Sequence, residues 1–226
     1  MCGDHVCLSL PSTDGGHVTV ERWGAATAPA TIVYVGALHS DSSLWAPVIT
    51  HLHGLLAGGI AQLTYTPRDR ATGAPAACVA TQMRHRVDEL DIVLTCAVGA
   101  VVLVTHSTGS LLAHAYAHRY PYRAAALAGL VLINGVTDRS WPASPATPVL
   151  RGVPAFVLAG GEDSRFSRAH SHWLAEMVWA DYDLVPGGGH CLPRSAPEQT
   201  AAPILAALDL AYCTEITGSS DSGDRP

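Results

Sequence analysis

Apolar and polar positions along the chain follow two patterns in turn. Seven short apolar runs, rich in Val, Ile, Leu and Tyr, are typical of buried β-strands. They lie at residues 17–23, 31–36, 60–65, 100–105, 130–134, 155–159 and 182–185. Between these runs, apolar residues recur every three or four positions, which is the period of an amphipathic helix. Helices are therefore expected at residues 44–56, 79–94, 108–119, 168–179 and 196–212.

Strands that alternate with helices predict an α/β fold, with a mostly parallel central sheet and helices on both faces. We expect a single domain over residues 1–213, because no linker and no internal repeat interrupts the alternation. Residues 214–226 are rich in Gly, Ser and Asp and have little to bury, so they predict a disordered C-terminal tail.

Composition removes several classes of function. All 13 basic side chains are Arg. Without Lys the chain has neither a Schiff-base nucleophile nor a phosphate-binding P-loop. The net charge of −6, with no basic run, argues against nucleic-acid binding and against a membrane-surface role. Neither a membrane-spanning run nor a secretory signal is evident, so we expect a cytoplasmic protein.

The fourth predicted strand runs directly into a helix through Thr105, His106, Ser107, Thr108 and Gly109. A serine at such a sharp turn is the nucleophile elbow of many serine hydrolases, and it needs small residues two positions to either side. Gly109 meets this requirement, whereas the β-branched Thr105 departs from it. The alternative is that Ser107 only caps the helix that follows.

Two further residues favour the catalytic interpretation. Asp163 and His190 each lie in a glycine-rich loop after a later predicted strand. The carboxyl ends of parallel strands meet at one edge of the sheet, so both side chains are expected near Ser107. Serine, acid and histidine also follow one another in the order that this triad takes on such a sheet. Asp138, just beyond the strand at residues 130–134, is a rival for the acid.

Together with a loop near the N-terminus, these motifs resemble the α/β-hydrolase superfamily, most of all 3-oxoadipate enol-lactonases and related small esterases. The loop at residues 36–41 reads Gly-Ala-Leu-His-Ser-Asp, and Trp45-Ala-Pro follows it. The resemblance implies that the backbone N–H groups of Leu38 and Thr108 form the oxyanion hole. If Gly36 takes the place of the glycine that precedes the oxyanion residue in many relatives, the donor is Ala37 instead.

Many members of this superfamily carry a helical cap over the site. Here only residues 135–152 separate two strands, and their prolines leave no room for several helices, so the cap is expected to be minimal or absent. The site should then be open, with an apolar lining. Its candidate substrate-binding residues are Trp45, Trp141, Phe166 and Leu192.

The sequence thus predicts a serine hydrolase that cleaves a small carboxylic ester or lactone through an acyl-enzyme on Ser107. No cofactor is expected. No metal site is expected either, because the pair His114 and His118 has no acidic or cysteine partner on its helix. One alternative is a thioesterase or cyclase that acts on the acyl thioester of a polyketide or peptide synthase. The other is a ligand-binding relative without turnover. Haloalkane or epoxide hydrolysis is disfavoured, because those branches have a carboxylate where Ser107 stands.

Overall fold

The structure is a computed structural model that describes residues 5–12, 16–37, 40–67, 79–138 and 140–218. Within these ranges a single sheet of eight strands has the order β1-β2-β4-β3-β5-β6-β7-β8. The strands are β1 His5–Pro11, β2 His17–Trp23, β3 Ala30–Val35, β4 Ala61–Thr66, β5 Ala100–His106, β6 Gly129–Ile133, β7 Ala155–Gly160 and β8 Asp181–Val185. Strands β1 and β2 are antiparallel to their neighbours, and every other pairing is parallel.

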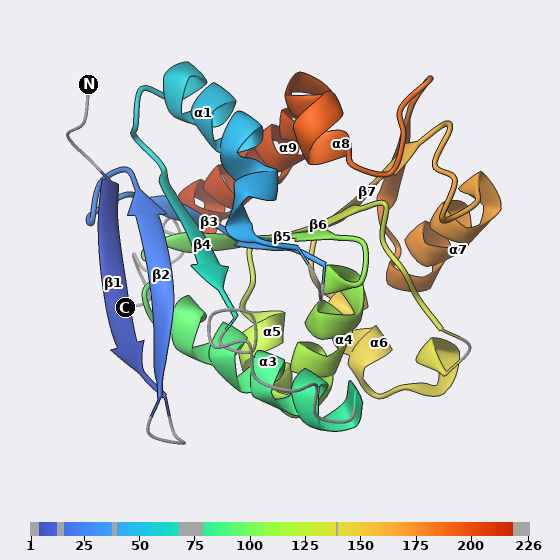
Figure 1. Cartoon of the computed structure of the whole chain (residues 1–226), viewed down its shortest axis with the longest axis horizontal. Coiled ribbons are helices and arrows are strands. Elements are labelled where there is room, and N and C mark those ends of the chain that lie inside the picture. The colour runs from blue at the N-terminus through green and yellow to red at the C-terminus, as the bar shows by residue number, and fades with distance from the viewer. Residues whose placement is uncertain (1–4, 13–15, 38–39, 68–78, 139, 219–226) are drawn as a thin grey trace, which may run out of the picture.

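Helices cover both faces of this sheet (Figure 1). The α-helices are α1 Ala46–Leu55, α3 Val79–Leu94, α4 Gly109–Arg119, α5 Pro121–Ala125, α6 Ala146–Arg151, α7 Arg168–Val178, α8 Leu192–Ser195 and α9 Pro197–Gly218. Two short 3₁₀ helices, η1 Ser42–Trp45 and η2 Trp141–Ala143, precede α1 and α6. The expected α/β architecture is confirmed.

The core is divided by the sheet into two layers. Helices α1, α8 and α9 pack on one face, whereas α3 to α7 pack on the other. The central strands β3 and β6 are buried at every position. Such continuous apolar runs are what a parallel strand needs when helices cover both of its faces. In β2, which pairs with the outermost strand, buried and exposed positions alternate over its first four residues.

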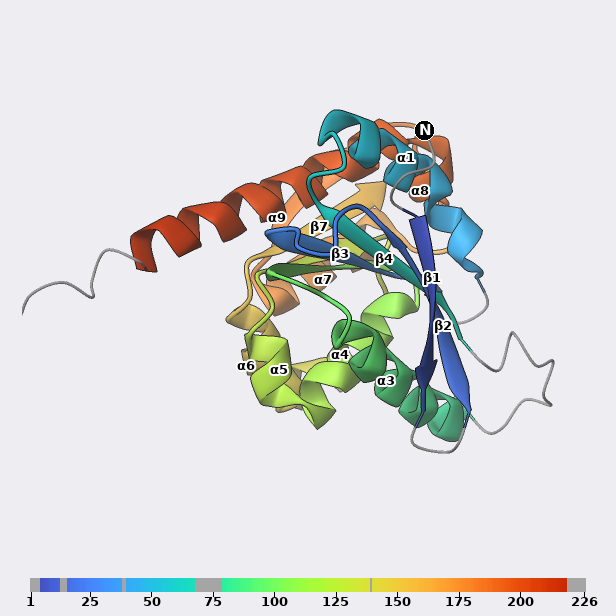
Figure 2. The same cartoon turned by 90° about the vertical axis from the view of Figure 1, so that its left-hand side faces the viewer.

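Two features at the ends of the chain differ from expectation. Strand β1 was not anticipated; its residues are mostly exposed, so the burial signal that marks the inner strands is weak there. Helix α9 continues to Gly218, five residues into the stretch expected to form a disordered tail, and it projects past the rest of the molecule (Figure 2). Residues 219–226 lie outside the described residues.

The stretch between β6 and β7 holds only η2 and α6 as helical elements among its described residues. The expectation of a minimal cap is therefore confirmed. In the described parts of the chain, no helix combines the length and the apolar character needed to cross a bilayer.

Candidate active site

Ser107 lies in the turn between β5 and α4. Its φ of 54° is left-handed, a conformation that non-glycine residues rarely adopt. The Ser107 N–H donates to the carbonyl of Ile133 on the neighbouring strand at 3.0 Å, which holds the turn in place. A Cβ at Gly109 would lie 2.8 Å from the carbonyl oxygen of Val35, so the start of α4 can approach β3 this closely only with glycine.

Three side chains from separate loops form a hydrogen-bonded row. The Nε2 atom of His190 lies 3.1 Å from Ser107 Oγ, and its Nδ1 atom lies 2.8 Å from Asp163 Oδ2. The side chains of His190 and Asp163 are only 11% and 2% exposed. A hydroxyl next to an imidazole that a carboxylate orients is the arrangement that activates a serine nucleophile.

The two candidate acids occupy different environments. Besides the imidazole, the Asp163 carboxylate accepts the backbone N–H groups of Arg165 at 2.7 Å and Phe166 at 3.2 Å. Asp138 is exposed, and it accepts the backbone N–H of Ser140 at 2.7 Å as well as the hydroxyl of that serine. These bonds hold the pKa of the Asp138 carboxyl below its usual value. The structure thus brings Asp163, and not Asp138, to the imidazole.

A second histidine supports the first and was not anticipated. His106 directly precedes the nucleophile, and its Nε2 atom lies 2.8 Å from the backbone carbonyl oxygen of His190. Burial lowers the pKa of His106 to about 4, so the ring is neutral at neutral pH. Because a carbonyl can only accept, the single ring proton of His106 is on Nε2. The two imidazole rings lie with their centroids 4.9 Å apart.

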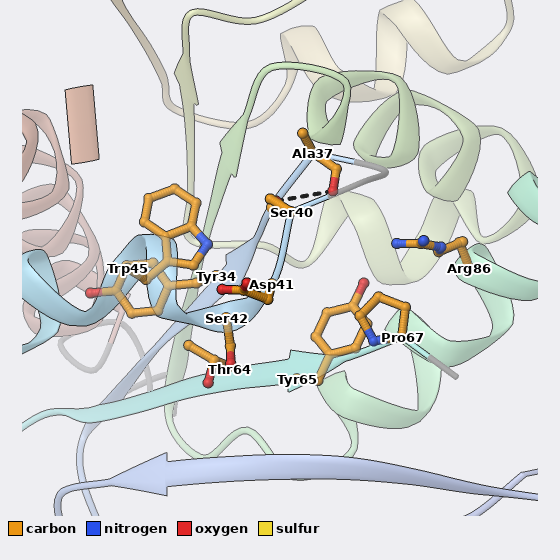
Figure 3. A pocket seen from close by; sticks show the side chains of 11 residues that line it. Tyr34, Ala37, Ser40, Asp41, Ser42, Trp45, Thr64, Tyr65, Pro67 and Arg86 are labelled. Atoms are coloured by element: carbon orange, nitrogen blue, oxygen red, sulfur yellow. Dashed lines mark hydrogen bonds between the residues drawn. The ribbon is translucent and has the colours of Figure 1, made fainter. Parts of the chain in front are cut away.

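The proposed oxyanion donors are only partly within the described residues. Thr108 directly follows Ser107 and occupies the N-cap position of α4, so its N–H belongs to the positive end of that helix. Leu38 lies outside the described residues. The alternative donor, Ala37, is described, and its carbonyl accepts both the N–H and the hydroxyl of Ser40 at 3.0 Å (Figure 3).

Three of the four expected substrate-binding residues are core residues instead. Trp45, Trp141 and Leu192 are each 1% exposed or less. Trp45 borders a cavity of about 10 Å³, which has room for no more than a single water molecule (Figure 3). Trp45 and Leu192 belong to the core layer on the side of α1, α8 and α9, and Trp141 belongs to the layer on the other side of the sheet. Phe166 alone is half-buried, with its ring centroid 5.5 Å from that of His190.

A larger groove of about 650 Å³ borders the loop that carries His190 between β8 and α8, here called the imidazole loop (residues 186–191). His190 and Arg165 line it together with Cys191 and Gln199. This volume lies in the range of small-molecule sites. Hydrophobic periodicity does not single out Arg165, Cys191 or Gln199, although the first two stand within two positions of Asp163 and His190 respectively. Throughout the described ranges, no three His, Cys, Asp or Glu side chains form a group that could hold a metal ion.

Neither a family model nor a curated protein matches the sequence. Solved structures do match. A thermophilic esterase from Thermogutta terrifontis is 16% identical with a TM-score of 0.67, and the match covers 92% of this chain and 99% of that one. The thioesterase domain from the curacin biosynthetic pathway is 14% identical with a TM-score of 0.68, over 90% and 100% of the two chains.

A haloalkane dehalogenase from Bradyrhizobium elkani is also similar, with 14% identity and a TM-score of 0.70 over 93% and 100% of the two chains. These neighbours cover nearly the whole chain, and their names span different reactions. At such low identities the likeness concerns the fold and not the activity. The chain has the α/β-hydrolase fold.

Proposed function

We propose that the protein is a serine hydrolase that cleaves a small carboxylic ester or lactone. The observation that carries this proposal is the row of hydrogen bonds from Ser107 through His190 to Asp163. It is reinforced by the left-handed turn at Ser107, since a strained backbone at a strand-to-helix junction is typical of a functional nucleophile. Serine at position 107 also disfavours the dehalogenase reaction, which needs a carboxylate there.

The reaction follows from the positions of these atoms. Ser107 Oγ attacks the carbonyl carbon of the substrate while its proton moves to His190 Nε2. When the tetrahedral intermediate collapses, the bond to the leaving oxygen breaks and that oxygen takes the proton from His190. Water then attacks the acyl-enzyme with the same proton relay, which releases the acid and frees Ser107. Asp163 orients the imidazole and stabilises its positive charge during both steps.

The oxyanion would be stabilised by backbone N–H groups. Thr108 supplies one from the positive end of α4, and Leu38 or Ala37 supplies the other. In comparable sites the loss of one such donor costs about 3 kcal/mol of transition-state stabilisation. All of these groups belong to the protein, so the proposed reaction needs no cofactor.

An activity-based fluorophosphonate probe tests the proposal directly, because only an activated serine attacks it. The wild-type protein should be labelled on Ser107 at neutral pH, whereas Ser107→Ala and His190→Ala should be unlabelled while their melting temperatures stay close to that of the wild type. Ser140→Ala, which removes an exposed serine, is the matched control and should be labelled normally. A folded wild-type protein that remains unlabelled would contradict the proposal.

The same chemistry would cleave an acyl thioester, which is the second candidate substrate. The minimal cap and the groove of about 650 Å³ beside His190 leave room for a long acyl or thiol group. Hydrolysis of p-nitrophenyl esters, lactones and acyl thioesters should be compared at equal concentrations. We expect esters or lactones to give the highest kcat/KM; a thioester preference of more than tenfold would favour the thioesterase.

A further inference from the structure

Strand β6 contributes no residue to the proposed triad, yet its end contacts all three loops that do. It lies between β5, which leads to the nucleophile, and β7, which leads to the acid. The carbonyl of Ile133, its last residue, accepts the N–H of Ser107. Asn134, the next residue, has its own N–H bonded to the carbonyl of Leu158 on β7 at 2.8 Å.

The side chain of Asn134 joins the end of β7, which leads into the loop that carries Asp163 (the acid loop, residues 161–167), to the imidazole loop. Its Oδ1 atom accepts the N–H of Gly160 at 2.7 Å, three residues before Asp163. Its Nδ2 atom donates to the carbonyl oxygens of Gly189 at 3.1 Å and His190 at 2.7 Å. Asn134 is fully buried, so water does not compete for these bonds.

Asparagine suits this position for two separate reasons. The φ of Asn134 is 45°, a left-handed conformation that Gly, Asn and Asp tolerate best. Glycine would accept this backbone but has no side chain to bond with. Aspartate would keep the acceptor for Gly160 but would turn a second oxygen toward two carbonyl oxygens. Only asparagine meets both demands, and Asn134 is the single asparagine in the chain.

The His190 carbonyl accepts two hydrogen bonds from different strands. Asn134 approaches it from the end of β6, and His106 Nε2 approaches it from the end of β5. Since a carbonyl oxygen has two lone pairs, both are used. The backbone at His190 is therefore fixed from two directions, which restricts where its ring can lie.

We propose that Asn134 is a positioning residue that holds the His190 backbone, and with it the imidazole, within reach of both Ser107 and Asp163. This inference rests on the proposed function and adds a residue that touches neither substrate nor the reacting atoms. A displacement of about 1 Å in a catalytic group can reduce a rate by about 100-fold. The bonds of a single buried amide can thus matter for turnover as well as for stability.

The test compares Asn134→Gly with a matched control. Asn134→Gly keeps the left-handed backbone and removes all three side-chain hydrogen bonds. The control is Gln62→Met, which removes another buried amide; that amide bonds the Tyr34 hydroxyl at 2.7 Å and the Ile49 carbonyl at 3.2 Å. Both variants should melt at lower temperatures, since each removes a buried network. The readouts are the rate of fluorophosphonate labelling, kcat and KM on an ester, and the downfield proton NMR signal of the His190–Asp163 hydrogen bond.

We expect Asn134→Gly to reduce labelling and kcat by about 10- to 100-fold with little change in KM, and to broaden or remove the downfield signal. Gln62→Met should keep the signal and a labelling rate within about threefold of the wild type. Asn134→Asp should be impaired like Asn134→Gly, because it loses the donor. If Asn134→Gly keeps the signal and the labelling rate, Asn134 is merely structural.

The NMR readout does not depend on turnover. An unlabelled wild-type protein whose downfield signal is lost in Asn134→Gly but kept in Gln62→Met would support positioning while contradicting the proposed hydrolase. A wild-type protein that is labelled, together with an unaffected Asn134→Gly, would contradict the positioning role alone. The two proposals thus fail in distinguishable ways.

Discussion

At the scale of single residues, the difference between Asp163 and Asp138 lies in what surrounds each carboxylate. Both follow a strand that ends near the proposed nucleophile. Asp163 is enclosed: its Oδ1 atom accepts hydrogen bonds from backbone N–H groups, and its Oδ2 atom is hydrogen-bonded to the imidazole of His190. Asp138 is exposed and bonds to Ser140. An enclosed carboxylate can fix the tautomer of an imidazole, whereas an exposed one that already caps a turn has no such role.

Substitution of the two acids should therefore have very different effects. Asp163→Asn should lower kcat on a p-nitrophenyl ester by about 10³- to 10⁴-fold, because the amide favours the wrong imidazole tautomer. Asp138→Asn is the matched control and should stay within about threefold of the wild type. Steady-state kinetics at neutral pH decide between them. The opposite ranking would transfer the role of the acid to Asp138.

At the scale of elements, the site depends on how closely the loops after β7 and β8 approach one another. The N–H of Glu162 donates to the Gly188 carbonyl at 2.8 Å, and the N–H of Gly161 donates to the Val185 carbonyl at the same distance. A Cβ at Gly160 would lie 2.5 Å from the carbonyl oxygens of both Gly188 and Gly189. The glycines therefore let the acid loop and the imidazole loop pack backbone against backbone.

A methyl group at this contact should disturb both stability and activity. In Gly160→Ala the new Cβ meets backbone atoms, so one loop must move, and we expect a loss of about 1 to 3 kcal/mol in unfolding free energy. Labelling of Ser107 should slow by at least about tenfold. Gly54→Ala is the control, because a Cβ there meets nothing within 4 Å. Its unfolding free energy should rise by up to about 1 kcal/mol, since alanine favours the helix α1 more than glycine does. Wild-type labelling of Gly160→Ala would show that the close approach is not needed.

At the scale of the whole molecule, two histidines on opposite faces of the sheet, the buried His106 and the half-buried His114, couple stability to pH. Burial lowers the pKa of both His106 and His114 to about 4. In the unfolded chain each would titrate near pH 6.5. Above that pH neither state is protonated, so these groups contribute nothing. As the pH falls from about 6.5 toward 4, the unfolded chain binds protons that the folded protein does not, and stability decreases.

Unfolding in urea at pH 7 and pH 5 should show this loss, which for the buried His106 approaches about 3 kcal/mol by pH 4. His114 stacks on Trp141 with a ring separation of 4.1 Å, away from the triad. His114→Phe keeps the stacking and removes the titrating group. Because His114 is only half-buried, solvent screens part of this effect. We therefore expect the stability lost between pH 7 and pH 5 to be smaller in this variant than in the wild type, by on the order of 1 kcal/mol, with normal labelling at pH 7. An unchanged pH dependence would contradict the assignment.

The sequence by itself determined the α/β-hydrolase fold and the order in which the candidate residues follow its strands. Inner strands such as β3 and β6 bury both faces, so they leave continuous apolar runs that can be recognised locally. Ser107, Asp163 and His190 could be singled out because parallel strands place their carboxyl ends at one edge. The exposed edge strand β1 lacks such a run and was missed.

The tertiary structure alone decided the contacts between segments that lie far apart in the sequence. It directs Asp163 rather than Asp138 to the imidazole, and it buries Trp45, Trp141 and Leu192 in the core. It also places Asn134 against loops 26 to 56 residues away. The periodicity of a segment records which face is buried, but a side-chain hydrogen bond between two loops exists only after the sheet has aligned them.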